Sequence, residues 1–286
     1  MFRILSFKTV TCFCAAVTFL AVVYLVFGTV RPSVSVFKQS TAELPVIMYH
    51  QISSNKNLFG DYVIPPELLE EDFKYIKGNG FTPVGIDELE AFVKNGTPLP
   101  EKSILITFDD GQRSFLTKVV PLLEKYNCPA VISVIGSLTE SYTQSGDTDD
   151  RYAYLNRNDI LTLSRNPLVE IGNHSYNMHS LSIRRGMGRL PGEPEAEYRG
   201  TVAADMRRLQ ALLFEITETK PRVLTYPYGE ENDILLDEAK KEGFTVTLTC
   251  RECINTLTPG GDLYELGRFN RPYGVSSEVF FERIFR

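Results

Sequence analysis

The chain of 286 residues contains no tryptophan, three histidines and five cysteines. So few cysteines in a chain of this length exclude a small scaffold held together by disulfides. Basic residues are not in excess, since 30 lysines and arginines stand against 36 aspartates and glutamates, and the formal net charge is −6. Nucleic-acid-binding proteins carry a basic surface, so we expect no nucleic-acid partner. An apolar content of 43% and a charged content of 23% are typical of a globular protein.

An uncharged, mostly apolar stretch occupies residues 9–30. About 20 apolar residues at ~1.5 Å per residue cross a ~30 Å hydrocarbon core. Arg3 and Lys8 precede the stretch and favour a cytoplasmic N-terminus. We therefore expect a signal-anchor transmembrane helix within residues 1–31, a stalk over 32–43, and a domain over 44–286 outside the cytoplasmic membrane. The alternative is a cleaved signal peptide, which would leave the domain secreted.

Beyond residue 43, apolar runs alternate with segments of helical periodicity. The apolar runs predict strands over 44–49, 103–108, 130–135, 168–171, 222–226 and 244–248. The periodic segments predict helices over 66–77, 86–93, 114–126, 198–218, 233–241 and 276–284. The polar residues 138–156 are expected to form a surface loop. Strands separated by helices predict an α/β fold with a mainly parallel sheet, and the number of units favours a closed or distorted barrel.

Two pairs of polar residues follow predicted strands, where the functional groups of parallel α/β proteins lie. Asp109 and Asp110 follow the strand over 103–108, and His174 and His179 follow the strand over 168–171. The carboxylates of the aspartate pair repel each other, and a bound cation would relieve this; the alternative is an ordinary helix N-cap. Two imidazoles and one carboxylate form the ligand set of a catalytic zinc site, which also suits cobalt, nickel or iron.

These segments resemble the motifs of the polysaccharide deacetylase family, also called the NodB-homology or family 4 carbohydrate esterase group. The first motif is Thr107-Phe108-Asp109-Asp110-Gly111, and the second is His174-Ser175 with the later His179. The segments PVIMYH at 45–50 and YPYGE at 226–230 are most similar to the poly-N-acetylglucosamine deacetylase branch. The resemblance extends from residue 44 to the C-terminus and implies a distorted (β/α) barrel.

The resemblance also implies a role for each residue of the motifs. Asp110, His174 and His179 would hold a divalent metal ion, most simply zinc. Asp109 would be the general base that takes a proton from the attacking water, while the metal polarises the carbonyl group. Tyr228 would donate its backbone N–H to the developing oxyanion.

The sequence departs from the family pattern at two places. Thr225 stands where the family has an arginine that orients the base, and Arg268 or Arg271 are the candidates to replace it. The family commonly has a late histidine as general acid, but no histidine follows His179. His50 is then the one imidazole that could serve as the acid; the alternative is a packed core histidine.

Two further features leave alternatives open. Cys250 and Cys253 form a C-x-x-C pair that would be either a local disulfide or two ordinary thiols. The acidic run at 147–150 lacks the glycine and the distal glutamate of a calcium loop, so a solvated loop is expected there.

Taken together, the residues and the resemblance predict a membrane-anchored, metal-dependent hydrolase. It would remove N-acetyl groups from a cell-surface polysaccharide of N-acetylated amino sugars, either poly-N-acetylglucosamine or peptidoglycan. Two alternatives use the same fold. One is an O-acetyl esterase on the same class of polymer, and the other is a carbohydrate-binding protein without catalytic activity.

Overall fold

A parallel sheet of nine strands forms the centre of the structure, a computed structural model that describes residues 41–285. Eight strands follow one another in space in the order β12 (Leu263–Leu266), β10 (Val246–Leu248), β9 (Val223–Thr225), β8 (Val169–Asn173), β7 (Ala130–Val134), β6 (Ser103–Phe108), β2 (Val46–Tyr49) and β13 (Phe269–Asn270). The ninth strand, β5 (Thr82–Pro83), also pairs with β6. Every pairing in this sheet is parallel, which confirms the predicted α/β class.

The two edges of this sheet are joined by a very short connection. Strands β12 and β13 stand at opposite ends of the strand order, yet only Gly267 and Arg268 separate them in the chain. Because a residue spans at most about 3.6 Å, the two edges must approach each other. The sheet is therefore curled into the distorted barrel that the sequence predicts.

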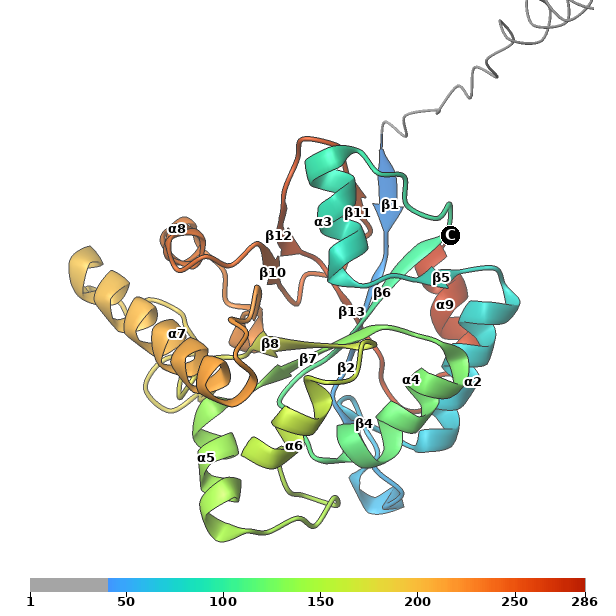
Figure 1. Cartoon of the computed structure of the whole chain (residues 1–286), viewed down its shortest axis with the longest axis horizontal. Helices are drawn as coiled ribbons and strands as arrows, with labels where there is room; N and C mark the ends of the chain where they lie inside the picture. Colours follow the sequence, from blue (N-terminus) through green and yellow to red (C-terminus); the bar gives the residue numbers. More distant parts are fainter. Residues whose placement is uncertain (1–40, 286) are drawn as a thin grey trace, which may run out of the picture. The chain divides into compact units, whose positions relative to one another are not determined.

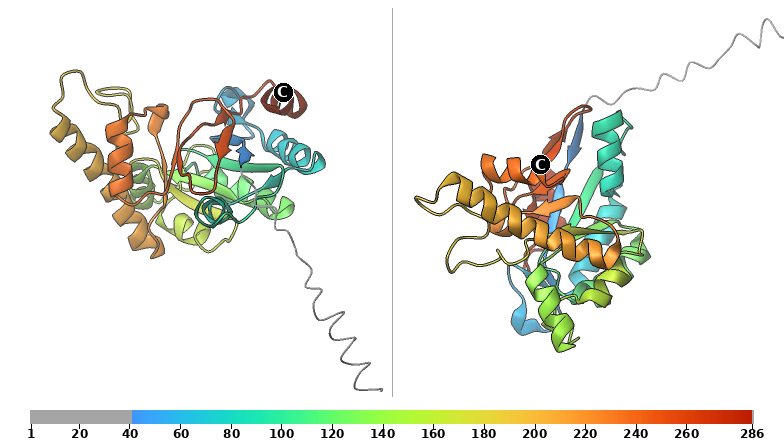
Figure 2. Two further views of the ribbon diagram at one scale, coloured as in Figure 1. Left: turned by 90° about the horizontal axis from the view of Figure 1, so that it is seen from above. Right: turned by 60° about the vertical axis from the view of Figure 1, so that its left-hand side comes forward.

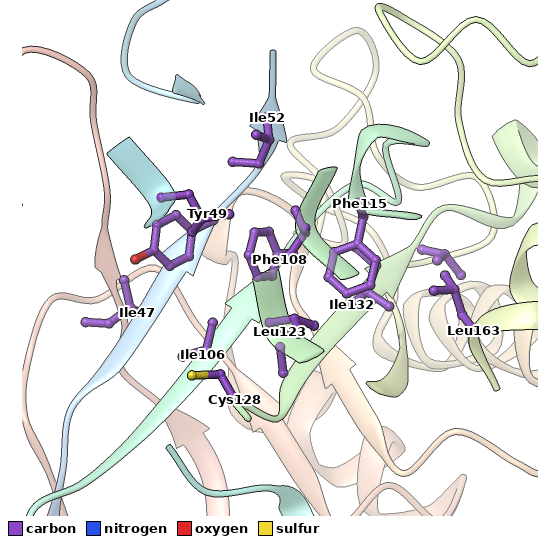
Figure 3. Packing of buried hydrophobic residues seen from close by; sticks show 14 of the residues in the cluster. Ile47, Tyr49, Ile52, Ile106, Phe108, Phe115, Leu123, Cys128, Ile132 and Leu163 are labelled. Carbon is purple, nitrogen blue, oxygen red and sulfur yellow. The ribbon is translucent and has the colours of Figure 1, made fainter. Parts of the chain in front are cut away.

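Helices surround the outside of the sheet (Figures 1 and 2). They are α2 (Pro66–Gly78), α3 (Ile86–Asn95), α4 (Val120–Tyr126), α5 (Gly136–Ser145), α6 (Arg157–Leu163), α7 (Glu195–Thr217), α8 (Asp233–Lys241) and α9 (Ser277–Phe285). Because helices cover the sheet, all six residues of β6 are buried. Phe108 at the end of β6 packs between Tyr49 and Phe115, with ring centroids 5.0 and 5.1 Å away (Figure 3).

The predicted strand over 44–49 is in fact two strands. Pro45 separates β1 (Ala42–Leu44) from β2, and β1 pairs with β11 (Asn255–Leu257) in an antiparallel ladder outside the main sheet. Proline has no N–H to donate, which accounts for a break at this point.

The predicted loop over 138–156 is wrong in its first part, because α5 occupies residues 136–145. Only Gly136 and Thr139 of this helix are buried, so the helix carries no apolar periodicity from which it could have been predicted. The acidic residues that follow bind protein donors: Asp147 accepts the hydroxyl of Tyr152, Asp149 binds Arg151, and Asp150 binds Lys118. The carboxylates of this acidic run therefore bind donors of the protein itself.

The predicted transmembrane segment lies outside the described residues, as does all but the end of the predicted stalk. Within residues 41–285, no helix has the length and apolar character needed to cross a bilayer.

Candidate metal and catalytic site

The carboxyl ends of four strands bring the candidate residues into one cleft of about 560 Å³. His50 follows β2, the aspartate pair follows β6, and His174 follows β8. Tyr228 lies in the short turn Pro227–Gly229 after β9. All six residues predicted from the sequence line this cleft: His50, Asp109, Asp110, His174, His179 and Tyr228.

Three of these residues point ligand atoms at a common point. Oδ1 of Asp110 lies 3.5 Å from Nε2 of His174 and 3.3 Å from Nε2 of His179. Ligand atoms of the three side chains all lie within 4.8 Å of one another. Oδ1 of Asp110 is buried and has no hydrogen-bond partner among the described residues. A buried oxygen without a donor is costly, and a cation would satisfy it. This donor set therefore fits a divalent metal ion.

Each imidazole also contacts another group through its Nδ1 atom, and these contacts orient the two rings toward Asp110. Nδ1 of His174 lies 2.8 Å from the carbonyl oxygen of Thr225, so Nδ1 carries the proton and Nε2 is left as the ligand atom. Nδ1 of His179 lies 3.4 Å from the hydroxyl of Tyr228, and the two rings lie 4.6 Å apart. Tyr228 thus contacts a predicted ligand through its side chain, a contact that the sequence does not predict.

The loop that carries both histidines is fixed by a carboxylate from α7. Asp205 accepts the backbone N–H of Tyr176 through one oxygen, at 2.7 Å, and that of Asn177 through the other, at 2.9 Å. These two residues lie between His174 and His179. One side chain therefore sets the path of the chain from the first histidine to the second.

Backbone strain is concentrated at the same place. Asp110, Ser175 and Tyr228 have φ values of +70°, +69° and +59°. Each such residue costs about 1–3 kcal/mol, and such residues persist where the surrounding structure enforces them. Gly111 also has a positive φ, +74°, and a Cβ there would lie only 3.0 Å from Cγ1 of Val134. The glycine of the first motif is therefore required by both conformation and space.

The predicted base, Asp109, forms a buried ion pair with Arg268. The guanidinium donates to the two carboxylate oxygens at 2.7 and 2.8 Å, and Arg268 also donates to the carbonyl of Thr249. Burial of Asp109 acts to raise its pKa, but the charge and hydrogen bonds of Arg268 outweigh burial and hold this pKa well below the usual range. Arg268 is thus the arginine that orients the predicted base.

The second candidate arginine has a different partner. Arg271 donates to the two oxygens of Asp72 at 2.9 and 3.0 Å, and Asp72 also accepts the hydroxyl of Tyr49. Arg271 and Asp72 are both fully buried. Neither residue of this pair lines the cleft.

His50 stands at the same cleft as the aspartate pair. Its Nδ1 is buried and finds no partner within residues 41–285, and its ring packs edge-on against Tyr62 with the centroids 4.8 Å apart. Burial lowers the pKa of His50 more than the charges of Asp109 and Asp110 raise it. A histidine that lacks a partner and faces a cleft is better placed for proton transfer than a packed core histidine.

Six residues that line the cleft were not predicted from the sequence as site residues: Met48, Tyr62, Leu181, Arg185, Cys250 and Asn270. Arg185 binds Glu230 at 2.7 Å and the carbonyl oxygen of Tyr228 at 3.3 Å, from a segment without periodicity. Tyr62 lines the cleft beside His50. Cys250 also lines it and, like Cys253, is a free thiol, so the disulfide alternative is wrong here.

Comparisons with known proteins agree with this geometry. The family model described as "Polysaccharide deacetylase" matches residues 96–247, more than half of the chain. The match includes the aspartate pair, both histidines of the second motif and Tyr228. His50 and Arg268 lie outside it.

Individual relatives are similar over different shares of their length. The poly-beta-1,6-N-acetyl-D-glucosamine N-deacetylase of Escherichia coli K12 is 32% identical over 200 residues, which cover 63% of this chain and 30% of that protein. The chain therefore spans about a third of this relative. The protein of the same name from Staphylococcus aureus MRSA252 is 25% identical over 76% of this chain and 70% of its own length.

Solved structures share the fold. A de-N-acetylase from Aggregatibacter actinomycetemcomitans superposes with a TM-score of 0.73 at 24% identity, over 84% of this chain and 99% of its own. IcaB from Ammonifex degensii superposes with a TM-score of 0.68 at 25% identity, over 81% and 93%.

Proposed function

The chain belongs to the polysaccharide deacetylase family, and on this premise we propose that its cleft hydrolyses N-acetyl groups on a cell-surface polysaccharide of N-acetylated amino sugars. The polymer would be poly-N-acetylglucosamine or peptidoglycan. One observation carries the proposal: Asp110, His174 and His179 converge beside an aspartate that a buried arginine keeps ionised. This arrangement provides a cation site and a proton acceptor at the same cleft.

Each side chain has a task in such a reaction. A divalent metal held by Asp110, His174 and His179 would supply Lewis-acid chemistry for the water and the carbonyl group. Asp109, fixed by two bonds from Arg268, accepts the proton of the attacking water. His50 donates a proton to the departing nitrogen. Tyr228 donates its backbone N–H to the oxyanion.

We propose zinc as the resident metal because two imidazoles, one carboxylate and an open position are its usual catalytic ligand set. The same donors suit cobalt, nickel and iron, and metal supply in the cell decides among such ions.

The proposal extends to the location of the enzyme. A polymeric substrate at the cell surface requires a catalytic domain outside the cytoplasmic membrane. The uncharged stretch at residues 9–30, preceded by Arg3 and Lys8, supports a single-pass anchor with that orientation.

Release of acetate from N-acetylglucosamine oligomers tests the proposal. The purified full-length protein is treated with a chelator, and single divalent metals are then added back. We expect the added metal to restore release in the wild type but not in Asp109→Asn. Asp87→Asn, at a side chain that is 83% exposed on α3, is the matched control and should behave as the wild type.

The same assay separates the alternatives. If the protein hydrolyses O-acetylated sugars and not N-acetylated ones, its function is that of an O-acetyl esterase and not of an N-deacetylase. If the protein binds oligomers and metal but releases no acetate, both enzymatic functions are wrong and the protein is a carbohydrate-binding protein.

A further inference from the structure

Two residues of the cleft combine apolar character with high exposure. Of the large hydrophobic side chains in residues 41–285, eight are exposed, and only Tyr62 and Leu181 among them line the cleft. Tyr62 is 60% exposed and Leu181 is 64% exposed. Exposed apolar groups at the edge of a cleft are a common sign of a ligand contact.

Tyr62 is held on a fixed backbone although its ring is exposed. Its carbonyl accepts the N–H of Gln51, and it directly precedes β4 (Val63–Ile64), which pairs with β3 (Gln51–Ile52). The neighbouring carbonyl of Asp61 accepts the side-chain N–H of Asn270, and His50 packs edge-on against the ring. The ring of Tyr62 therefore has a fixed position at the cleft, where a ligand can pack against it.

Leu181 reaches the cleft from the segment that follows His179. Its neighbour Ser180 accepts the N–H of Gly186 at 3.0 Å, which closes this segment into a turn. A Cβ on Gly186 would lie 2.4 Å from the carbonyl oxygen of Pro227, so the turn packs tightly against the residue preceding Tyr228. Ile183, two positions further on, is 81% exposed and does not line the cleft.

The polar groups of the cleft indicate the charge of the ligand. Arg185 is paired with Glu230, and Arg268 is paired with Asp109, so both arginines near the cleft already have carboxylate partners. Asn270 also lines the cleft, and its side-chain N–H donates to the carbonyl of Asp61. A ligand with apolar faces and without a carboxylate suits these groups.

We propose that Tyr62 and Leu181 form a sugar-binding subsite, where they pack against the apolar faces of the pyranose units next to the unit being deacetylated. The inference rests on the proposed function and adds to it a preference for a neutral polymer chain over a single sugar. The chain has no tryptophan, so a tyrosine supplies the aromatic surface that sugars commonly pack on.

Kinetics as a function of oligomer length test the subsite. The probes are N-acetylglucosamine and its β-1,6-linked oligomers of increasing length, with the metal-loaded full-length protein. Tyr62→Ala and Leu181→Ala should each lower kcat/KM for long oligomers by roughly tenfold, the size of one lost aromatic or apolar contact, with a smaller effect on the monomer. Tyr62→Phe keeps the ring and should retain most of the wild-type value.

Matched controls are available for both side chains. Ile183→Ala and Tyr152→Ala remove residues of the same types that are 81% and 50% exposed but do not line the cleft. Both should show the wild-type dependence on oligomer length. If Tyr62→Ala and Leu181→Ala also show the wild-type dependence, the subsite does not exist.

A binding measurement separates this inference from the proposed function. Calorimetric titration of the same oligomers into Asp109→Asn requires no turnover. Tyr62→Ala in that background should weaken binding of long oligomers by roughly tenfold, and an unchanged Kd overturns the subsite. Failure of the wild type to release acetate, with binding still dependent on Tyr62, would overturn the proposed function and leave the subsite standing.

Discussion

Arg268 reaches Asp109 across 159 positions of sequence, and the two buried side chains meet through two contacts of 2.7 and 2.8 Å. Removing one partner of a buried ion pair leaves an uncompensated charge, which costs about 3–5 kcal/mol. We expect Arg268→Met to lower the free energy of unfolding by that amount and to reduce kcat by about 100-fold or more, because the proposed base, Asp109, loses its orientation. Denaturant unfolding and acetate release measure the two effects.

Arg271→Met is the control for that prediction, because it breaks the other buried pair, with Asp72, and does not touch the base. Arg271→Met should lower the free energy of unfolding by a similar amount, but it should lower kcat much less in the fraction that stays folded. Equal losses of kcat in the two variants would contradict a specific role for Arg268.

Asp205 should control metal affinity without touching the metal. Asp205→Ala removes both acceptors that hold Tyr176 and Asn177, so the two histidines lose their fixed spacing. We expect metal affinity to fall by about 10- to 100-fold, the usual cost of losing an outer contact to a ligand. Titration of zinc or cobalt into chelator-treated protein measures this. Asp205→Asn keeps one acceptor oxygen, so its metal affinity should lie between those of the wild type and Asp205→Ala. Glu197→Ala, at an exposed position of α7, should bind the metal as the wild type does. An unchanged affinity in Asp205→Ala would refute the assignment.

The cysteines of the described region should differ in reactivity. Burial raises the pKa of both thiols, that of Cys128 to about 11, but Cys128 is fully buried whereas Cys250 is exposed at the cleft. A thiol reagent at mildly alkaline pH should label Cys250 in the native protein and leave Cys128 unlabelled until denaturant is added. Peptide mass spectrometry identifies the labelled residues. Rapid native labelling of Cys128 would contradict its burial.

Glu70 should contribute to the loss of stability in acid. It accepts hydrogen bonds from Lys125 and Tyr126 of α4, which lower its pKa to about 2. The unfolded chain takes up this proton at its ordinary pKa near 4.3, so the contribution is present above that pH and is lost as the pH falls toward 2. In Glu70→Gln, stability measured by denaturant at several pH values should fall less steeply across this window. Identical slopes in the two proteins would show that the contact contributes nothing.

Much of the fold follows from local patterns. β6 and α8 have the bounds that their sequences predict, because β6 is a continuous apolar run and α8 has clear helical spacing. The shortest strands, such as β11 and β13, carry too few residues for any period to show. α5 escapes prediction because its residues are nearly all polar.

Some residues of the candidate site could likewise be predicted from the sequence, and others could not. Asp109, Asp110, His174 and His179 stand in compact motifs, so their association could be predicted from the sequence alone. The choice between Arg268 and Arg271 could not be predicted, because both flank β13 and only the packing of the folded chain determines which guanidinium reaches Asp109. The role of Asp205 could not be predicted, because the sequence around an aspartate within a helix does not indicate which distant residues it contacts.

The short connection between the two edges of the sheet has a consequence for how the molecule is built. Arg268 is one of the two residues of that connection, whereas the residues that converge on the cation site are all present in the chain by His179. Synthesis proceeds from the N-terminus, and domains fold as it proceeds. A growing chain therefore contains the three proposed metal ligands well before Arg268, the partner of Asp109, is made. The Asp109–Arg268 pair can form only after the connection between the two edges of the sheet has been synthesised.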